Sequence, residues 1–254
     1  MKLDSSYSFA PDRANDLVEK VTYKPTGPQE EFIVPVLKEE IDKLIEEYTV
    51  VNQGKNRVLD VGCGRQPFRN VFETKGYQYL SLDAQQSPEN AVDFICEIDQ
   101  LLPDMILDAS PFNFIFCTEV LEHVADWDMT FRNFYQLLAP GGRLLITCPH
   151  FYPLHEVPYD FWRPTPYALQ YYGSKFGLKL LYQNNAGNTW DILGTILGAS
   201  HIMPASRKIT DRVISRIAKY SHQILFSLLA NRFLQSHVQL NSSLYLANIA
   251  IFEK

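Results

Sequence analysis

A glycine-rich turn and an acid downstream of it are the first residues whose types and spacing indicate chemistry. The run Asp60-Val61-Gly62-Cys63-Gly64 follows an apolar segment. Glycines at such a turn let the backbone approach a ligand closely, because no Cβ intervenes. Asp83 ends the next apolar segment, 21 positions after Gly62, where a carboxylate can bind the hydroxyls of a ribose. Together these features predict a site for an adenosine-type ligand.

Pro67 narrows the class of ligand. The dinucleotide fingerprint GxGxxG requires a third glycine at position 67, where this chain has proline. Pyrophosphate binding uses free backbone N–H groups at the start of the helix, and proline lacks one. We therefore expect a ligand without phosphate groups, and a nicotinamide-dependent oxidoreductase is disfavoured.

A second group of polar residues lies in the run CPHFYPLHEVPYDFWRPT, residues 148–165. Its prolines stiffen a loop without regular hydrogen bonding, and its aromatic residues can exclude water. His155 is predicted to be the general base, because the ordinary pKa of histidine is close to neutrality. Glu156 or Asp160 would orient it. The acceptor is expected to contact His150, Tyr152 and Arg163.

Two alternatives concern the same loop. Asp160 and Arg163 can instead form an ion pair that fixes the loop. A metal site is not expected, because a His–Glu pair has too few evident ligands in this segment. The four cysteines also lack the spacing of a zinc site (Cys63, Cys96, Cys117 and Cys148).

Short apolar runs alternate with helical patterns through most of the chain. We predict strands at 57–62, 77–83, 91–96, 113–118, 143–149, 178–183 and 243–254, and helices at 29–48, 67–76, 127–138 and 166–176. Pro35 would kink or split the first helix. The alternation predicts a Rossmann-like α/β fold with a mostly parallel seven-stranded sheet and helices on both faces. We divide the chain into an N-terminal arm (1–27) and one domain (28–254) with a helical insert (186–242) before the last strand.

Four runs carry a resemblance to a known family. VLDVGCGRQPF, LDA, NFIFCTEVLEHV and LLAPGGRLLITCP occur in this order between residues 58 and 149. They resemble the successive motifs of class I S-adenosylmethionine-dependent methyltransferases. The resemblance implies that S-adenosylmethionine is the cofactor. Gln66 departs from the pattern, because many members have a third glycine there.

The resemblance also implies roles for individual residues. Asp60, Gly62 and Gly64 would surround the methionine part of the cofactor, and Asp83 would bind the ribose. The adenine would lie against Ala84, Glu97 and Ile98. Thr118 and Glu119 would line the methionine side, with His123 nearby. Glu122 and His123 can also be read as the polar first turn of a helix.

The predicted function is methyl transfer to a small-molecule, sugar or lipid-linked acceptor, at oxygen. The alternative is a partner subunit that binds the cofactor without catalysis. The net charge of −6 argues against a nucleic-acid partner. The chain has no signal-peptide pattern and no apolar run long enough to span a bilayer. We therefore expect a cytoplasmic protein.

Residues 201–238 differ in charge from the rest of the chain. Six basic residues and one acidic residue give this segment a charge of +5. On an ideal helix the four cations Lys208, Arg212, Arg216 and Lys219 fall within about 80°. An apolar stripe lies beside them (Val213, Ile217, Tyr220, Ile224 and Leu228). Such a helix can lie on an anionic membrane surface, or pack on the domain's own core or on a second copy in a homodimer.

Overall fold

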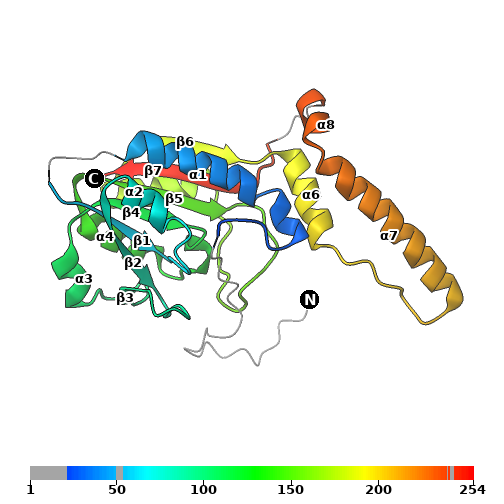
Figure 1. Cartoon of the computed structure of the whole chain (residues 1–254), viewed down its shortest axis with the longest axis horizontal. Helices are drawn as coiled ribbons and strands as arrows, with labels where there is room; N and C mark the ends of the chain where they lie inside the picture. The colour runs from blue at the N-terminus through cyan, green and yellow to red at the C-terminus, as the bar shows by residue number, and fades with distance from the viewer. Residues whose placement is uncertain (1–21, 50–53, 239, 241–242) are drawn as a thin grey trace.

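The computed structural model describes residues 22–49, 54–238, 240 and 243–254, and these form one seven-stranded sheet with helices on both faces (Figure 1). The strand order is β3-β2-β1-β4-β5-β7-β6. β7 runs antiparallel to both of its neighbours, and the other pairs are parallel. The Rossmann-like, mostly parallel sheet predicted from the sequence is confirmed. The strands are β1 (Asn56–Val61), β2 (Tyr77–Asp83), β3 (Phe94–Ile95), β4 (Phe112–Thr118), β5 (Leu138–Pro149), β6 (Lys179–Ala186) and β7 (Ala247–Glu253).

Two apolar clusters cover the two faces of the sheet. Side chains on opposite faces alternate along a strand, so Val58 belongs to one cluster and Leu59 to the other. The first cluster packs under α1 (Val34–Tyr48) and α2 (Arg69–Thr74). The second packs under α3 (Asp104–Ala109), α4 (Trp127–Leu137) and α5 (Pro166–Lys175).

Several element boundaries differ from those predicted. The first helix is split into a 3₁₀ turn, η1 (Pro28–Glu31), and α1, with Pro35 in the first turn of α1. β3 is shorter than expected because Asp93 bonds through its side chain: its carboxylate accepts from the Ser81 N–H at 2.9 Å and from the Ser81 hydroxyl at 2.7 Å. α3 has no counterpart among the predicted elements. Most of the predicted N-terminal arm, residues 1–21, lies outside the described residues.

Three helices connect β6 to β7: α6 (Thr189–Ala199), α7 (Ile209–Leu229) and α8 (Arg232–His237). α6 packs closely on η1: the backbones approach so tightly at Gly198 that a Cβ there would lie 2.6 Å from the backbone of Pro28 and Gln29. α7 extends away from the sheet (Figure 1), and Ser215 and Leu229 are its buried residues. Among the described residues, no helix combines the length and the apolar character that crossing a membrane requires.

Candidate active site

A cavity of about 520 Å³ opens at the carboxyl ends of β1, β2 and β4. The strand order reverses direction at β1, since β2 lies on one side of it and β4 on the other. Open α/β sheets bind their ligands at such a switch point. The cavity is therefore positioned by the topology of the sheet.

The glycine turn after β1 forms one wall of the cavity. Gly62 and Gly64 have φ angles of +67° and +49°, in the region that favours glycine. A Cβ at Gly64 would meet nothing within 4 Å, so the backbone there is open to a ligand. Gln66 also has a positive φ, +57°, and its side-chain amide donates to the carbonyl of Ala91 at 2.6 Å. That bond helps to hold Gln66 in the positive-φ conformation, which a glycine at this position would adopt without strain.

Asp83 lies at the end of β2 on the rim of the cavity. Its Oδ2 accepts from the N–H of Gly64 at 2.9 Å, and its Oδ1 accepts from the N–H of Gln85 at 3.2 Å. Each carboxylate oxygen can accept a further hydrogen bond. The open backbone at Gly64 and the anchored carboxylate together fit the sugar and the adjoining chain of an adenosine ligand.

We expect Asp83→Ala to weaken binding of S-adenosylmethionine by about 1.5–3 kcal/mol, the range for a hydrogen bond to a charged group. The physical reason is loss of the carboxylate that is predicted to accept hydrogen bonds from the ribose. Calorimetric titration of the folded variant measures the change. An unchanged dissociation constant would remove the ribose assignment.

Asp60 is buried at the base of the cavity, where the Tyr79 hydroxyl donates to its carboxylate. Burial raises the pKa of Asp60 to about 7, and the charge of Asp83 adds to this effect. Asp60 therefore acts as a positioned hydrogen-bonding group within the wall. Its role toward the methionine part of the cofactor stays a prediction.

The other residues predicted for the cofactor also line the cavity: Ala84, Glu97, Ile98, Thr118 and Glu119. Glu119 has a φ of +54°, which costs energy in a residue with a Cβ. The Thr147 hydroxyl holds its carboxylate by donating to Oε1 at 2.8 Å. The structure thus gathers into one cavity the side chains that the sequence motifs indicated.

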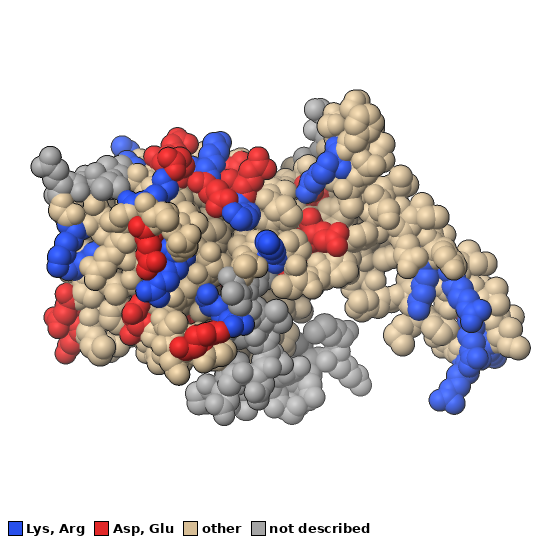
Figure 2. Space-filling view, viewed as in Figure 1, with Lys and Arg blue, Asp and Glu red and all other residues tan. Residues whose placement is uncertain are grey.

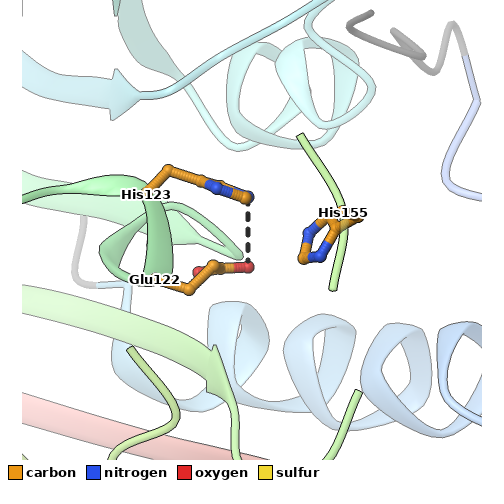
Figure 3. Close-up of side chains that lie close together, drawn as sticks. All are labelled: Glu122, His123 and His155. Atoms are coloured by element: carbon orange, nitrogen blue, oxygen red, sulfur yellow. Dashed lines mark ion pairs between the residues drawn. The ribbon is translucent and has the colours of Figure 1, made fainter. Parts of the chain in front are cut away.

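The same cavity is also lined by a cluster of three polar side chains, Glu122, His123 and His155. Glu122 and His123 lie in the 3₁₀ turn η2 (Leu121–His123) after β4, and His155 lies in the loop after β5. Figure 3 shows the His155 ring opposite the other two side chains. The rings of His123 and His155 meet edge to face, with their centroids 4.7 Å apart. Glu156 Oε2 lies 3.7 Å from His123 Nε2, so Glu156 also contacts the cluster.

Burial determines which of these groups carry charge. It lowers the pKa of His123 to about 4, with a further contribution from His155. It also lowers the pKa of His155, against the opposing effect of Asp160. Burial and the neighbouring Glu119 raise the pKa of Glu122 well above its usual range. Both imidazoles are therefore neutral at pH 7.

Asp160 and Arg163 fix the loop that carries His155. Arg163 donates to both carboxylate oxygens of Asp160, at 2.6 and 2.8 Å, and to the carbonyls of Tyr152 and Pro153, each at 3.2 Å. Burial opposes ionisation of Asp160, but the bonds from Arg163 outweigh it and keep the pKa below its usual value. Asp160 also accepts from the backbone N–H of His155 at 3.0 Å. This geometry supports the ion-pair interpretation of the two residues.

The residues predicted to contact the acceptor do not all reach the cavity. Tyr152 lines it, whereas His150 and Arg163 are absent from its wall among the described residues. The His150 ring instead stacks on Tyr245, with centroids 4.3 Å apart, and its Nδ1 bonds to the carbonyl of Pro164. Acceptor contacts by His150 and Arg163 therefore have no support from the geometry.

The cavity has lining residues that the sequence analysis did not assign. Tyr23, Thr26, Gln29 and Glu30 come from the segment before α1, and no motif in that segment indicates a site. Glu122 and His123 did carry a signal, since they follow a strand that ends at the cofactor side. Sequence alone could not separate that signal from an ordinary helix start.

Comparisons with known proteins identify the family of the chain. A family described as a methyltransferase domain matches residues 34–184. The ubiquinone biosynthesis O-methyltransferase of Pseudomonas entomophila is 27% identical over 142 residues, which cover 52% of this chain and 56% of that protein. The enzyme of the same name from Coxiella burnetii is 30% identical over 109 residues, covering 40% of this chain and 46% of that protein. The chain spans about half the length of the curated relatives it matches.

Solved structures share the fold at low sequence identity. The YcgJ protein from Bacillus subtilis superposes with a TM-score of 0.50 at 18% identity, covering 85% of this chain and 97% of that one. The [4+2]-cyclase SpnF superposes with a TM-score of 0.51 at 18% identity, covering 92% and 97%. Since a protein named as a cyclase has this fold, the fold by itself does not determine the reaction.

Proposed function

The chain belongs to the class I S-adenosylmethionine-dependent methyltransferases, and we propose that it transfers a methyl group to an oxygen atom of a small-molecule, sugar or lipid-linked acceptor. One observation carries the proposal: the glycine turn with Asp83 and the cluster of Glu122, His123 and His155 line the same cavity. A subunit that only bound the cofactor would have no use for such a cluster. The O-methyltransferase names of the relatives add support for oxygen as the acceptor atom.

The chain's own residues account for the steps around the transfer. S-adenosylmethionine supplies a methyl group bonded to a positively charged sulfur. The acceptor oxygen loses its proton to a group in the cavity and forms the new bond to carbon. The old carbon–sulfur bond breaks, and its electron pair stays on sulfur. A positioned base contributes about 100- to 10,000-fold to such a step.

We propose that His155 acts on the acceptor hydroxyl and that Asp160 positions it. Asp160 accepts from the His155 backbone N–H, and its Oδ2 lies 3.3 Å from His155 Nδ1. Glu156, the next residue, has a φ of +50° and also lines the cavity. Tyr152 on the cavity wall would contact the acceptor.

Transfer of label tests the function directly. The purified protein is incubated with S-adenosylmethionine labelled in its methyl group and with fractionated cell extract. We expect label in a low-molecular-weight or lipid fraction, accumulating there at least about 100-fold more slowly with the His155→Ala variant. Label found only in protein or nucleic acid would contradict the proposed acceptor class. No label in any fraction, from a protein that binds the cofactor, would favour the non-catalytic subunit.

We also propose that α7 places the protein against an anionic membrane surface, near a lipid-linked acceptor. The apolar stripe of α7 (Val213, Ile217, Tyr220, Ile224 and Leu228) is 47–69% exposed. On a helix at 100° per residue, the stripe lies roughly 160° from the side that packs on α6. That packed side is marked by buried Ser215 and Leu229 and by His222, which bonds to the carbonyl of Leu197. The stripe therefore faces away from the domain.

The charge beside the stripe argues for an anionic partner. Figure 2 shows Lys and Arg side chains gathered along the amino-terminal part of α7, without Asp or Glu among them on this face. Within the described part of the chain, Lys208, Arg212, Arg216 and Lys219 form no ion pair within 4 Å of an acidic group. An apolar stripe with adjacent cations is the pattern of a helix lying in a membrane interface. In a symmetric dimer formed through α7, these cations would face their own copies, and like charges repel.

Co-sedimentation with vesicles of phosphatidylcholine and phosphatidylglycerol tests the membrane contact. We expect binding at low salt that falls as salt rises, because anionic lipids attract each nearby cation by about 1 kcal/mol. Changing Arg212, Arg216 and Lys219 together to Gln should weaken binding about 100-fold. The matched control changes three exposed cations elsewhere, Lys24, Lys43 and Lys179, to Gln. Absence of binding at low salt, or a solution dimer that Ile217→Asp dissociates, would overturn this proposal.

A further inference from the structure

The cluster beside the cofactor wall has the composition of a metal site. Glu122, His123 and His155 each offer one ligand atom, and these atoms lie within 4.8 Å of one another (Figure 3). We propose that they bind a divalent transition-metal ion, and that this ion holds the acceptor oxygen during methyl transfer. The second half of this proposal rests on the proposed function, whereas the binding of the ion does not.

The hydrogen bonds of the two histidines prepare them as ligands. His123 Nδ1 lies 2.8 Å from the carbonyl oxygen of Tyr159. A carbonyl can only accept, so Nδ1 carries the proton and Nε2 keeps its lone pair. His155 Nδ1 lies 3.2 Å from the carbonyl of Pro153 and 3.3 Å from Asp160 Oδ2, which assigns its tautomer in the same way. Metal-binding histidines commonly donate their second N–H to a carbonyl or a carboxylate.

Glu122 supplies the negative charge that a cation requires. Its side chain is 1% exposed, its Oε2 lies 3.8 Å from the thiol sulfur of Cys148, and its Oε1 lies 3.7 Å from His123 Nε2. Among the described residues, neutral His123 is the sole basic side chain within 4 Å of this carboxylate. A buried carboxylate must be neutralised by a proton or by a cation. A bound metal ion would displace that proton.

The donor set and the surroundings indicate which ions fit. Two imidazole nitrogens with one carboxylate suit Zn²⁺ or Fe²⁺ better than Mg²⁺ or Ca²⁺. Bonds of about 2.1 Å place the ligands of one ion roughly 3–3.5 Å apart, so the three ligand atoms, which lie within 4.8 Å of one another, must draw together when the ion binds. Three protein ligands leave coordination positions open, and all three residues line the cavity. An acceptor hydroxyl bound there would lose its proton more readily.

With a metal ion bound, the expected roles of His155 and Glu156 change. His155 would act on the acceptor through the ion, and Glu156, whose Oε2 lies 3.7 Å from His123 Nε2, would take the proton. No metal site is expected from the sequence, because the loop with His155 and Glu156 holds too few ligands by itself. The other two ligands lie more than 30 residues earlier in the chain.

Cobalt binding tests the site without reference to activity. The purified protein is stripped with a chelator and titrated with Co²⁺, whose visible absorption reports nitrogen and oxygen ligands. We expect one ion per chain, displaced by Zn²⁺. His123→Ala, His155→Ala and Glu122→Gln should each weaken binding by at least about 100-fold. The matched control is His201→Ala, which removes an exposed histidine outside the cluster.

The outcomes separate this proposal from the proposed function. Each variant is first shown to be folded by its binding of S-adenosylhomocysteine. The metal site would be overturned if the folded wild-type protein failed to bind Co²⁺. It would also be overturned if all three cluster variants bound Co²⁺ as tightly as the wild-type protein. Methyl transfer that survives complete removal of metal would overturn the ion's catalytic role and leave the methyltransferase function intact. Metal binding without methyl transfer to any fraction would overturn the methyltransferase function and leave the metal site intact.

Discussion

Replacing His155 with alanine is expected to lower kcat by about 100- to 10,000-fold while leaving the affinity for S-adenosylmethionine unchanged. The imidazole lines the same cavity as the glycine turn and lies in the loop after β5. Its loss removes the group that acts on the acceptor oxygen, directly or as a ligand of the proposed ion. The hydrogen bonds that Asp83 accepts from Gly64 and Gln85 do not involve His155, so the cofactor wall should persist. Steady-state kinetics with the identified acceptor, together with calorimetry, measure the two quantities.

Two further variants interpret that result. Asp160→Asn keeps the shape of the carboxyl group but weakens the bidentate pair with Arg163, so we expect a smaller loss of kcat than for His155→Ala. His201→Ala, in the connection between α6 and α7, should behave as the wild-type protein. Full turnover by His155→Ala would show that proximity alone drives transfer or that another residue serves.

Gly62→Ala is expected to lower the free energy of unfolding by about 2–5 kcal/mol. The φ of +67° at this position costs a residue with a Cβ about 1–2 kcal/mol. A Cβ there would also lie 2.2 Å from Cγ2 of Val120, and such overpacking costs about 1–3 kcal/mol more. Denaturant unfolding without cofactor measures the change.

Two other substitutions separate the conformational cost of Gly62→Ala from its steric cost. Gly76 has a similar φ of +81° but nothing within 4 Å of its Cβ position, so Gly76→Ala should show the conformational cost alone. Val120→Ala removes the two methyl groups that the new Cβ meets. Combined with Gly62→Ala, it should recover part of the lost stability. If Gly62→Ala were no more destabilising than Gly76→Ala, the close approach to Val120 would be unimportant.

The fold could be predicted from the sequence because its signals are local. Apolar runs such as 57–62 and 113–118 are buried on both faces, as central parallel strands require. The glycine turn and Asp83 could be predicted for the same reason, since each sits at the end of its own strand. Strand β3 was predicted too long, because a side-chain bond between Asp93 and Ser81 replaces the ladder there.

The acceptor side depended on contacts that no local pattern encodes. The meeting of His123 with His155 joins two turns from different strands. Tyr23 and Glu30 reach the cavity from a segment without any motif. The periodicity of α7 gave its apolar stripe correctly but could not say whether the stripe faces the core. In the structure the stripe is exposed, because Ser215 and Leu229 form the packed side instead.

Calorimetric titration of S-adenosylmethionine into the purified chain tests the central claim most directly. We expect one saturable site per chain, with competition by S-adenosylhomocysteine and unchanged affinity in the His155→Ala variant. NADH should not bind, because Pro67 removes an N–H group that a pyrophosphate would use. A folded protein that fails to bind S-adenosylmethionine, or that binds NADH in its place, would contradict the account.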